Sequence, residues 1–196
     1  MEITTIQQWN NLKPADYHTV TKLTLYNNNL TTLPDSIGSL TNLQELNLSK
    51  NKLTTLPDSI GSLVNLQELD LSCNNLIILP DCIGSLTNLQ RLDLSENNLT
   101  TLPDSIGSLV NLSELDLQYN NFTTLPDTFY KISSHCYIKT DSEALLNNLP
   151  NNLEYLCFEN LNLPLTNLTC ALMELKLKEC DDVKIKLPYG CKKIDL

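Results

Sequence analysis

Residues 66–76 read LQELDLSCNNL, and this stretch decides the fold because the chain repeats its pattern, LxxLxLxxNxL, five times. The copies begin 23 residues apart, at Val20, Leu43, Leu66, Leu89 and Leu112. Each copy continues through a turn rich in Thr or Ile into Leu-Pro-Asp and a short apolar string. Repetition at a fixed period indicates a solenoid, in which each unit packs mainly on its neighbours.

The alternating leucines of each copy predict a β-strand. Apolar and polar residues alternate around Leu69 and Leu71 with the period of two that a strand requires. One strand per unit, always running in the same direction, predicts a parallel sheet. We expect the amides of the ninth-position asparagines to stack and to satisfy backbone groups where the chain leaves each strand. These residues are Asn28, Asn51, Asn74, Asn97 and Asn120.

The recurring Pro-Asp-Ser-Ile predicts a short helix on the other side of each unit, with proline at its entry and Asp or Ser as its cap. We interpret the repeated aspartates as helix caps: Asp35, Asp58, Asp81, Asp104 and Asp127. Because no unit can bury its leucines alone, stacking must create the core. The predicted class is an α/β solenoid with a curved parallel sheet on its concave face and short helices or turns on its convex face.

Residues 20 to about 134 resemble leucine-rich repeats of the 23-residue class. The resemblance rests on strings such as LPDSIGSLTNLQELNLSKNKL, and it is closest to the intracellular group related to Ras-binding scaffold proteins. It implies a leucine-rich-repeat solenoid that works as a signalling adaptor.

The last third of the chain follows a shorter period. Further units are expected to open at His135, Leu153, Leu172 and Cys191, which are 18, 19 and 19 residues apart. The shortening predicts that the convex helical segment has been deleted and the strand kept. These units resemble the compact repeats of secreted bacterial ubiquitin-ligase effectors, and also the Ile/Leu-Pro repeats of amoebae and their giant viruses.

Three segments are therefore expected: a cap at 1–19, regular repeats at 20–134, and degenerate and short repeats at 135–196 that continue the same solenoid. Apolar residues three apart in the first segment predict an amphipathic cap helix that covers the first repeat, with a docking peptide as the alternative. They are Ile3, Ile6, Trp9 and Leu12.

Composition restricts the partners. The formal net charge of −10 argues against nucleic acid as the main ligand, because a phosphate backbone requires a cationic surface. The first 20 residues lack a secretory pattern and no apolar run is long enough to span a bilayer, so we expect a cytoplasmic protein without membrane contact. For a viral or effector protein that would be the host cytoplasm. We also expect a monomer, with a homodimer through the exposed last strand as the alternative. Seven cysteines without CxxC spacing indicate reduced thiols.

The predicted concave face carries the candidate binding residues, at the third, fifth, seventh and eighth positions of the units. One interpretation is a partner-binding surface with an acidic centre and Tyr119 as an anchor. The other is that the acids of the repeated ELDLS string are only solvated. Residues that break the repeat are the better candidates for specificity: Tyr26, Lys50, Arg91 and Tyr119. The full candidate set is Tyr26, Glu45, Lys50, Glu68, Asp70, Arg91, Asp93, Glu96, Glu114, Asp116, Tyr119, Lys176 and Lys178.

We expect no catalytic residue, cofactor or metal site. Asp70, Asp93 and Asp116 in adjacent strands would lie about 5 Å apart, but an open column offers fewer oxygens than calcium requires. His135 and Cys136 would point to opposite faces of a strand, with His135 in a core leucine position, so a cysteine nucleophile is not expected.

The leading hypothesis is a non-enzymatic scaffold that binds a partner protein on its concave face, in signalling or in the modulation of host factors. A second hypothesis is the substrate-recognition module of a ubiquitin-ligase-type effector whose catalytic domain is absent from this chain. A third is a decoy that occupies host factors without transmitting a signal. Analogy of fold does not choose among them.

Overall fold

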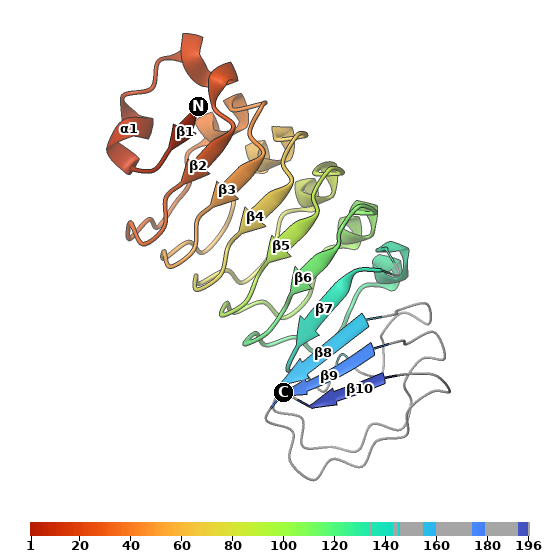
Figure 1. Ribbon diagram of the computed structural model, residues 1–196. Coiled ribbons are helices and arrows are strands. Elements are labelled where there is room, and N and C mark those ends of the chain that lie inside the picture. The colour runs from red at the N-terminus through yellow and green to blue at the C-terminus, as the bar shows by residue number, and fades with distance from the viewer. Residues whose placement is uncertain (134, 143–144, 146–154, 160–173, 179–191, 196) are drawn as a thin grey trace.

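The computed structural model describes residues 1–133, 135–142, 145, 155–159, 174–178 and 192–195. Within them the strands form one ten-stranded parallel sheet whose order in space is their order in the chain (Figure 1). The strands are β1 (Glu2–Ile3), β2 (Lys22–Thr24), β3 (Glu45–Asn47), β4 (Glu68–Asp70), β5 (Arg91–Asp93), β6 (Glu114–Asp116), β7 (Tyr137–Thr140), β8 (Tyr155–Glu159), β9 (Glu174–Lys178) and β10 (Lys192–Asp195).

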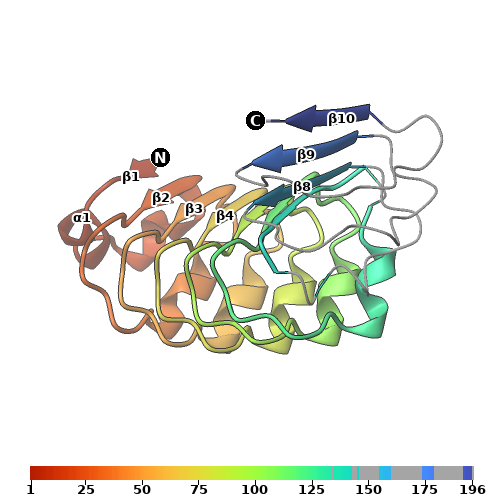
Figure 2. The ribbon, with the colours of Figure 1, turned by 90° about the horizontal axis from the view of Figure 1, so that it is seen from below.

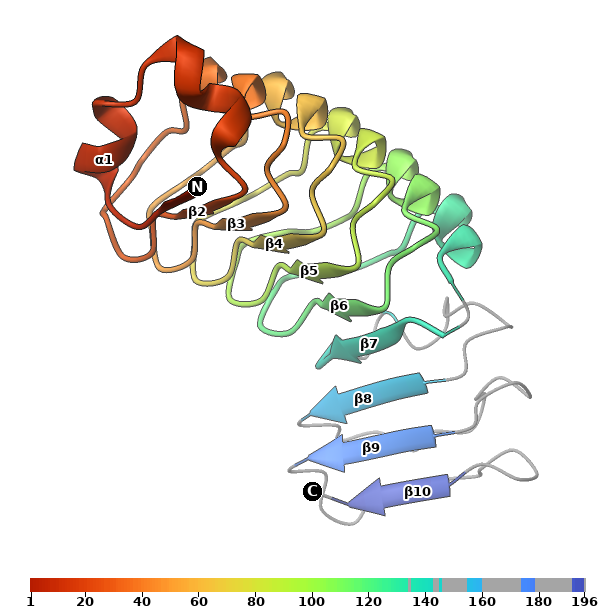
Figure 3. The same ribbon diagram turned by 45° about the horizontal axis from the view of Figure 1, so that its top comes forward.

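The α-helix α1 (Ile6–Asn10) lies at the N-terminal end of the stack (Figure 1). Short 3₁₀ helices line the side of the stack away from the sheet, as Figures 2 and 3 show. These are η1 (Pro14–Thr19), η2 (Asp35–Ser39), η3 (Asp58–Ser62), η4 (Asp81–Ser85), η5 (Asp104–Ser108) and η6 (Asp127–Lys131). The predicted class, a solenoid with strands on one face and short helices on the other, is confirmed.

The alternation of the sequence becomes the two faces of the sheet. Glu68 pairs in register with Arg91, and Leu69 pairs with Leu92, so equivalent positions of successive units stand side by side. Leu69 and Leu71 are buried, and the leucines of all regular units join one continuous hydrophobic cluster with Ile3 at one end. Stacking therefore supplies the core that no unit could form alone.

The ninth-position asparagines form a ladder that joins neighbouring units. The side-chain nitrogen of Asn74 donates to the carbonyl oxygens of Leu48 and Leu71, at 3.0 Å each. Its side-chain oxygen accepts from the backbone N–H of Leu53 at 3.0 Å. Asn51, Asn97 and Asn120 make equivalent bonds. The expected stack is thus confirmed for these four residues, whereas Asn28 in the first unit donates to the Tyr26 carbonyl at 2.9 Å.

The interpretation of the repeated aspartates as helix caps is wrong. In η2 the N-cap residue is Pro34, and Asp35 is the first helical residue without a capping hydrogen bond from its side chain. The other four units repeat this arrangement. The reason is the tight 3₁₀ turn, in which the Pro34 carbonyl already accepts from the Ile37 N–H at 3.0 Å. The carboxylates are left exposed on the flank of the solenoid.

Neighbouring 3₁₀ helices approach until their backbones touch. A Cβ added at Gly84 would lie 2.5 Å from the carbonyl oxygen of Ser105 in the next unit. The glycine of the repeat is therefore required by lack of space between units, and the helices can pack only with a small residue at this position.

The first segment differs from the single helix that the spacing predicted. Ile3 lies in β1, which pairs with β2 and leaves this side chain buried. The helix begins only at Ile6, because Thr5 and Gln8 form a capping box there. Trp9 is the buried residue of this helix and belongs to the same core cluster.

The register of β7 confirms the unit expected to open at His135, because Glu114 pairs with Tyr137. The placement of His135 in a core position is wrong: His135 is exposed and the next residue, Cys136, is buried, with its N–H donating to the Ser133 carbonyl at 2.9 Å. The opening expected at Cys191 is wrong by one residue. In β10, Lys192 pairs with Glu174, so that unit begins one residue before Cys191. The predicted deletion of the convex segment falls mainly on 146–154, 160–173 and 179–191, which lie outside the described residues.

The asparagine ladder yields a prediction about stability. Replacing Asn74 by Ala leaves the buried Leu53 N–H without its acceptor. It also removes one of the two amide donors to each of the Leu48 and Leu71 carbonyls, which still accept from Asn51 and Asn97. An unsatisfied buried polar group costs about 1–3 kcal/mol and a lost hydrogen bond about 1 kcal/mol, so we expect a loss of about 3 kcal/mol in the free energy of unfolding.

The matched control is Asn75→Ala, because Asn75 is the next residue and its side chain is exposed. We expect this variant to stay within about 0.5 kcal/mol of wild type. Urea unfolding followed by circular dichroism measures both, and equal stability of the two variants would show that the ladder is not needed.

Candidate functional site

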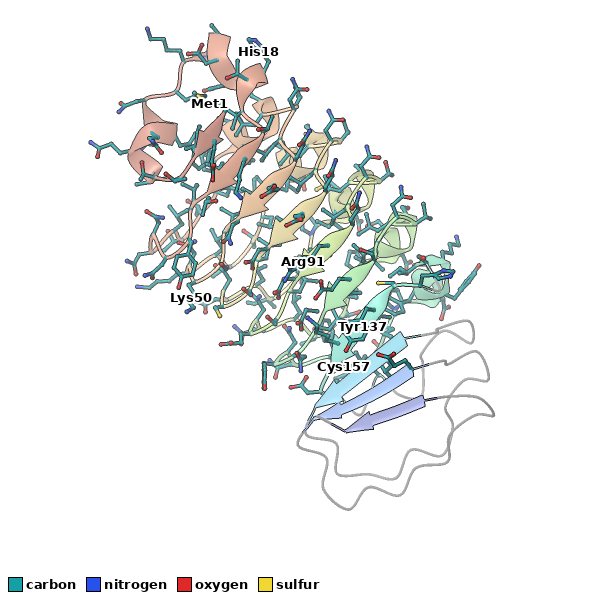
Figure 4. The ribbon with its side chains drawn as sticks, viewed as in Figure 1. Met1, His18, Lys50, Arg91, Tyr137 and Cys157 are labelled. Carbon is teal, nitrogen blue, oxygen red and sulfur yellow. The ribbon has the colours of Figure 1, made fainter. Side chains whose placement is uncertain are left out.

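The concave surface, defined here as the third- and fifth-position side chains of β2 to β7, contains a small cavity. Its volume is about 250 Å³. Arg91 projects from β5 near the middle of the sheet (Figure 4). The cavity is lined by Lys22, Thr24, Glu45, Leu46, Asn47, Glu68, Leu69, Asp70 and Arg91. The structure thus brings together the predicted residues Glu45, Glu68, Asp70 and Arg91.

The third-position side chains of successive units form a row across the sheet. Ion pairs neutralise the charges at the two ends of this row and leave the charge in its middle unpaired among the described residues. Lys22 and Glu45 are 2.8 Å apart, and this contact raises the pKa of Lys22. At the other end, Arg91 lies 3.5 Å from Glu114, which also contacts Lys139. Glu68 stands in register between Glu45 and Arg91. Its side chain is exposed and makes no ion pair within the described part of the chain.

The fifth-position acids do more than either interpretation of the sequence proposed. Asp70 accepts through Oδ1 from the Ser72 backbone N–H at 3.0 Å and from the Ser72 hydroxyl at 2.7 Å. Asp93 makes the same two bonds to Ser95. These carboxylates therefore hold the turn that follows each strand. The Asp-x-Ser spacing within the repeated ELDLS string is the sequence signal for this role.

Asp116 is the most buried acid of this column, with 8% of its surface exposed. Burial raises its pKa to about 6, against the opposing effect of a hydrogen bond from the Gln118 N–H. The nearby carboxylate of Asp93 raises it further, and Lys139, at 3.5 Å from Oδ2, lowers it. Burial thus gives this column a carboxyl group that titrates near pH 6.

The seventh and eighth positions lie at the edge of the concave surface and not on the sheet, because each regular strand ends at the fifth position. Tyr26, Lys50, Glu96 and Tyr119 therefore occupy the turns, and this part of the prediction is corrected. Lys50, Glu96 and Tyr119 have φ between 53 and 54°, in the left-handed region that side chains rarely adopt.

Hydrogen bonds to the next unit hold this backbone. The Lys50 N–H donates to the Ser72 carbonyl at 3.0 Å, and the Tyr119 N–H donates to Oδ2 of Asp141 at 3.0 Å. These side chains thus project from a fixed position. The Lys50 ammonium lies 5.4 Å from the centre of the Tyr26 ring, which gives this edge a cation–π pair.

The remaining predicted residues are only partly described. Lys176 and Lys178 belong to β9, where Lys176 pairs with Cys157 and Lys178 with Glu159, but their side chains lie outside the described residues. Next to them, Tyr137 and Cys157 lie on the neighbouring strands β7 and β8 (Figure 4).

The cysteine beside the histidine is an inert thiol. Cys136 is fully buried, and burial raises its pKa to about 12, so it stays protonated at neutral pH. Within the described ranges no three His, Cys, Asp or Glu side chains gather to hold a metal ion. The helices of the same ranges are too short or too polar to cross a membrane.

Comparison with known proteins gives one family. The model of the family described as leucine rich repeat matches residues 18–76 and 78–134. An LRR protein of Leptospira interrogans has a TM-score of 0.59 and 31% identity over 90% of this chain and 56% of that one. InlP of Listeria monocytogenes has a TM-score of 0.54 and 30% identity over 74% of this chain and 36% of that one.

A plant peptide hormone receptor, RGFR1 in complex with RGF2, has a TM-score of 0.62 over 100% of this chain and 34% of that one. At 24% identity it shows the fold alone. No curated protein matches. The chain spans between about a third and somewhat over half of the length of these solved structures.

Asp116 makes stability depend on pH in a definite direction. Its pKa is about 6 in the folded chain and about 3.9 in an unfolded chain, so the folded state binds this proton more tightly. The contribution of Asp116 to the free energy of unfolding therefore falls as pH rises from about 4 to about 6. Asp116→Asn lacks this titration. We expect its stability relative to wild type to rise over that interval by up to about 3 kcal/mol, since one pKa unit corresponds to about 1.4 kcal/mol.

Urea unfolding of both proteins at several pH values between 4 and 7 measures this difference. Other carboxyl groups titrate in both proteins, so only the difference between them reports Asp116. A difference that stays constant with pH would show that Asp116 ionises normally in the folded state.

Proposed function

Because the chain belongs to the leucine-rich-repeat family, we propose that it is a non-enzymatic interaction module that binds a partner protein on its concave surface. The observation that carries this proposal is the exposed carboxylate of Glu68 in the cavity, between neighbours that are already ion-paired. An extended partner segment with a basic side chain would complete this row. The rigid sheet offers its surface preformed, so that binding costs little ordering entropy.

The edge of the concave surface supports the same function. Tyr119 is 47% exposed on a turn held by hydrogen bonds to the next unit. Exposed, well-positioned tyrosines often provide a large share of the binding energy at protein interfaces. We expect Tyr119 and Arg91 to distinguish partners, because both depart from the residues at equivalent positions in the other units.

We place this interaction in the cytoplasm, on a monomer. The described cysteines Cys73, Cys82, Cys136 and Cys157 are free thiols, which supports a reducing compartment. The finer proposal of a substrate-recognition module for a ubiquitin-ligase-type effector rests on the short units of 135–196, which the matched family segments do not reach.

Affinity capture from cytosolic extract tests the concave surface. Wild type is compared with Arg91→Ala/Tyr119→Ala by quantitative mass spectrometry, after circular dichroism has shown that both are folded. We expect a partner retained by wild type to fall at least tenfold with the double variant, because it loses an exposed cation and an exposed ring.

The chain offers a matched control. Tyr130, 59% exposed, and Lys131 form a similar tyrosine–cation pair on η6, with the ammonium 6.0 Å from the ring centre. Tyr130→Ala/Lys131→Ala should retain the partner. Identical profiles for the concave variant and wild type, or loss only with the η6 variant, would contradict concave binding.

A further inference from the structure

One unit departs from the repeat where no core position requires it. The two residues that follow the last apolar residue of the LxxLxLxxNxL pattern are Thr-Thr in four regular units, at 31–32, 54–55, 100–101 and 123–124. In the third unit they are Ile77 and Ile78. Each isoleucine is 56% exposed, so neither replaces a missing core residue. Two adjacent aliphatic side chains thus face solvent where threonine would satisfy the fold.

The surroundings extend Ile78 into an apolar surface. A shallow hollow of about 630 Å³ is lined by Leu56, Ile78, Pro80 and Cys82 together with Thr55 and two carboxylates. Leu56 is 6% exposed and Cys82 packs against the core, so they form its floor. We call these four residues, together with the exposed Ile77 next to Ile78 in the chain, the flank patch. It lies between the end of one strand's turn and the start of η4, and shares no residue with the concave surface.

Negative charge surrounds the flank patch. Asp58 and Asp81 line the same hollow, and both are exposed at the first residue of their helices. Neither has a side-chain cap bond, and neither makes an ion pair within the ranges that the structure describes. Burial raises the pKa of the Cys82 thiol, and the nearby carboxylates of Asp58 and Asp81 raise it further.

The charge selects the kind of partner. A second copy would bring the same carboxylates against one another on a chain of net charge −10, which like-charge repulsion opposes. A segment that carries an aliphatic side chain between lysines or arginines would cover the isoleucines and pair with both aspartates. We propose that the flank patch is a second docking surface, which takes a protein segment of this basic and aliphatic composition.

A variant that gives the third unit the same residues as the other regular units tests the proposal. Ile77→Thr/Ile78→Thr restores the Thr-Thr of the other four regular units, so folding should be unaffected. The probes are three synthetic peptides. The first has a Leu-Ile-Leu centre flanked by lysines, the second has glutamate in place of lysine, and the third has serine in place of the aliphatic centre.

Binding is followed by NMR of isoleucine methyl groups in the full chain. We expect the basic aliphatic peptide to shift the Ile77 and Ile78 signals, and its affinity to fall at least tenfold for Asp58→Asn/Asp81→Asn, with a loss of salt dependence. For Ile77→Thr/Ile78→Thr, which lacks those signals, fluorescence anisotropy of a labelled peptide should show a similar fall. The acidic and serine peptides should not bind.

A matched control removes the equivalent charges from units that carry Thr-Thr. Asp104→Asn/Asp127→Asn, which changes the exposed first residues of η5 and η6, should bind the basic aliphatic peptide as wild type does. Equal binding by wild type and the threonine variant, or by the basic and acidic peptides, would overturn the proposal. Sedimentation showing a wild-type dimer that the threonine variant does not form would replace the cationic partner with a second copy.

Discussion

The asparagine ladder is the interaction on which the rest of this structure depends. Each ladder amide donates to a carbonyl of its own unit and to one of the preceding unit, and it accepts from a backbone N–H of the preceding unit, as Asn74 does. One short side chain thus satisfies three backbone groups that the chain exposes when it turns out of the strand. Because the bonds cross between units, the turns and the sheet are ordered together.

The turn that the ladder organises also determines what the protein presents to solvent. It holds the eighth residue of successive units in the left-handed region, at Lys50, Cys73, Glu96 and Tyr119. Strain of this kind persists only where surrounding bonds hold the backbone. The Asp70 and Asp93 carboxylates contribute through their serine partners. The acids of the concave column thus have a structural task, while Glu68 has none that the described residues reveal.

Two surfaces with different chemistry result from one repeat. On the concave surface, charge pairs occupy the ends of the third-position row and leave an exposed acid between them. On the flank, two aspartates that cap no helix line the same hollow as the exposed Ile78. The first surface arises because the side chains at the outward-facing strand positions differ from unit to unit. The second arises because two isoleucines replace the Thr-Thr pair of the other regular units, a difference that stands out only when the units are compared with one another.

The sequence by itself determined the solenoid, the parallel register and the ladder, because a period of 23 residues leaves each leucine and each asparagine only one environment. It also indicated Arg91 and Tyr119 through their departure from the pattern. Only the tertiary structure decided that proline is the N-cap, that Asp116 is buried, that His135 is exposed, and that the eighth residues lie in turns. These features depend on distances between neighbouring units and on one-residue shifts of backbone hydrogen bonds. The pattern of residue types along the chain contains no information on these distances or on these shifts.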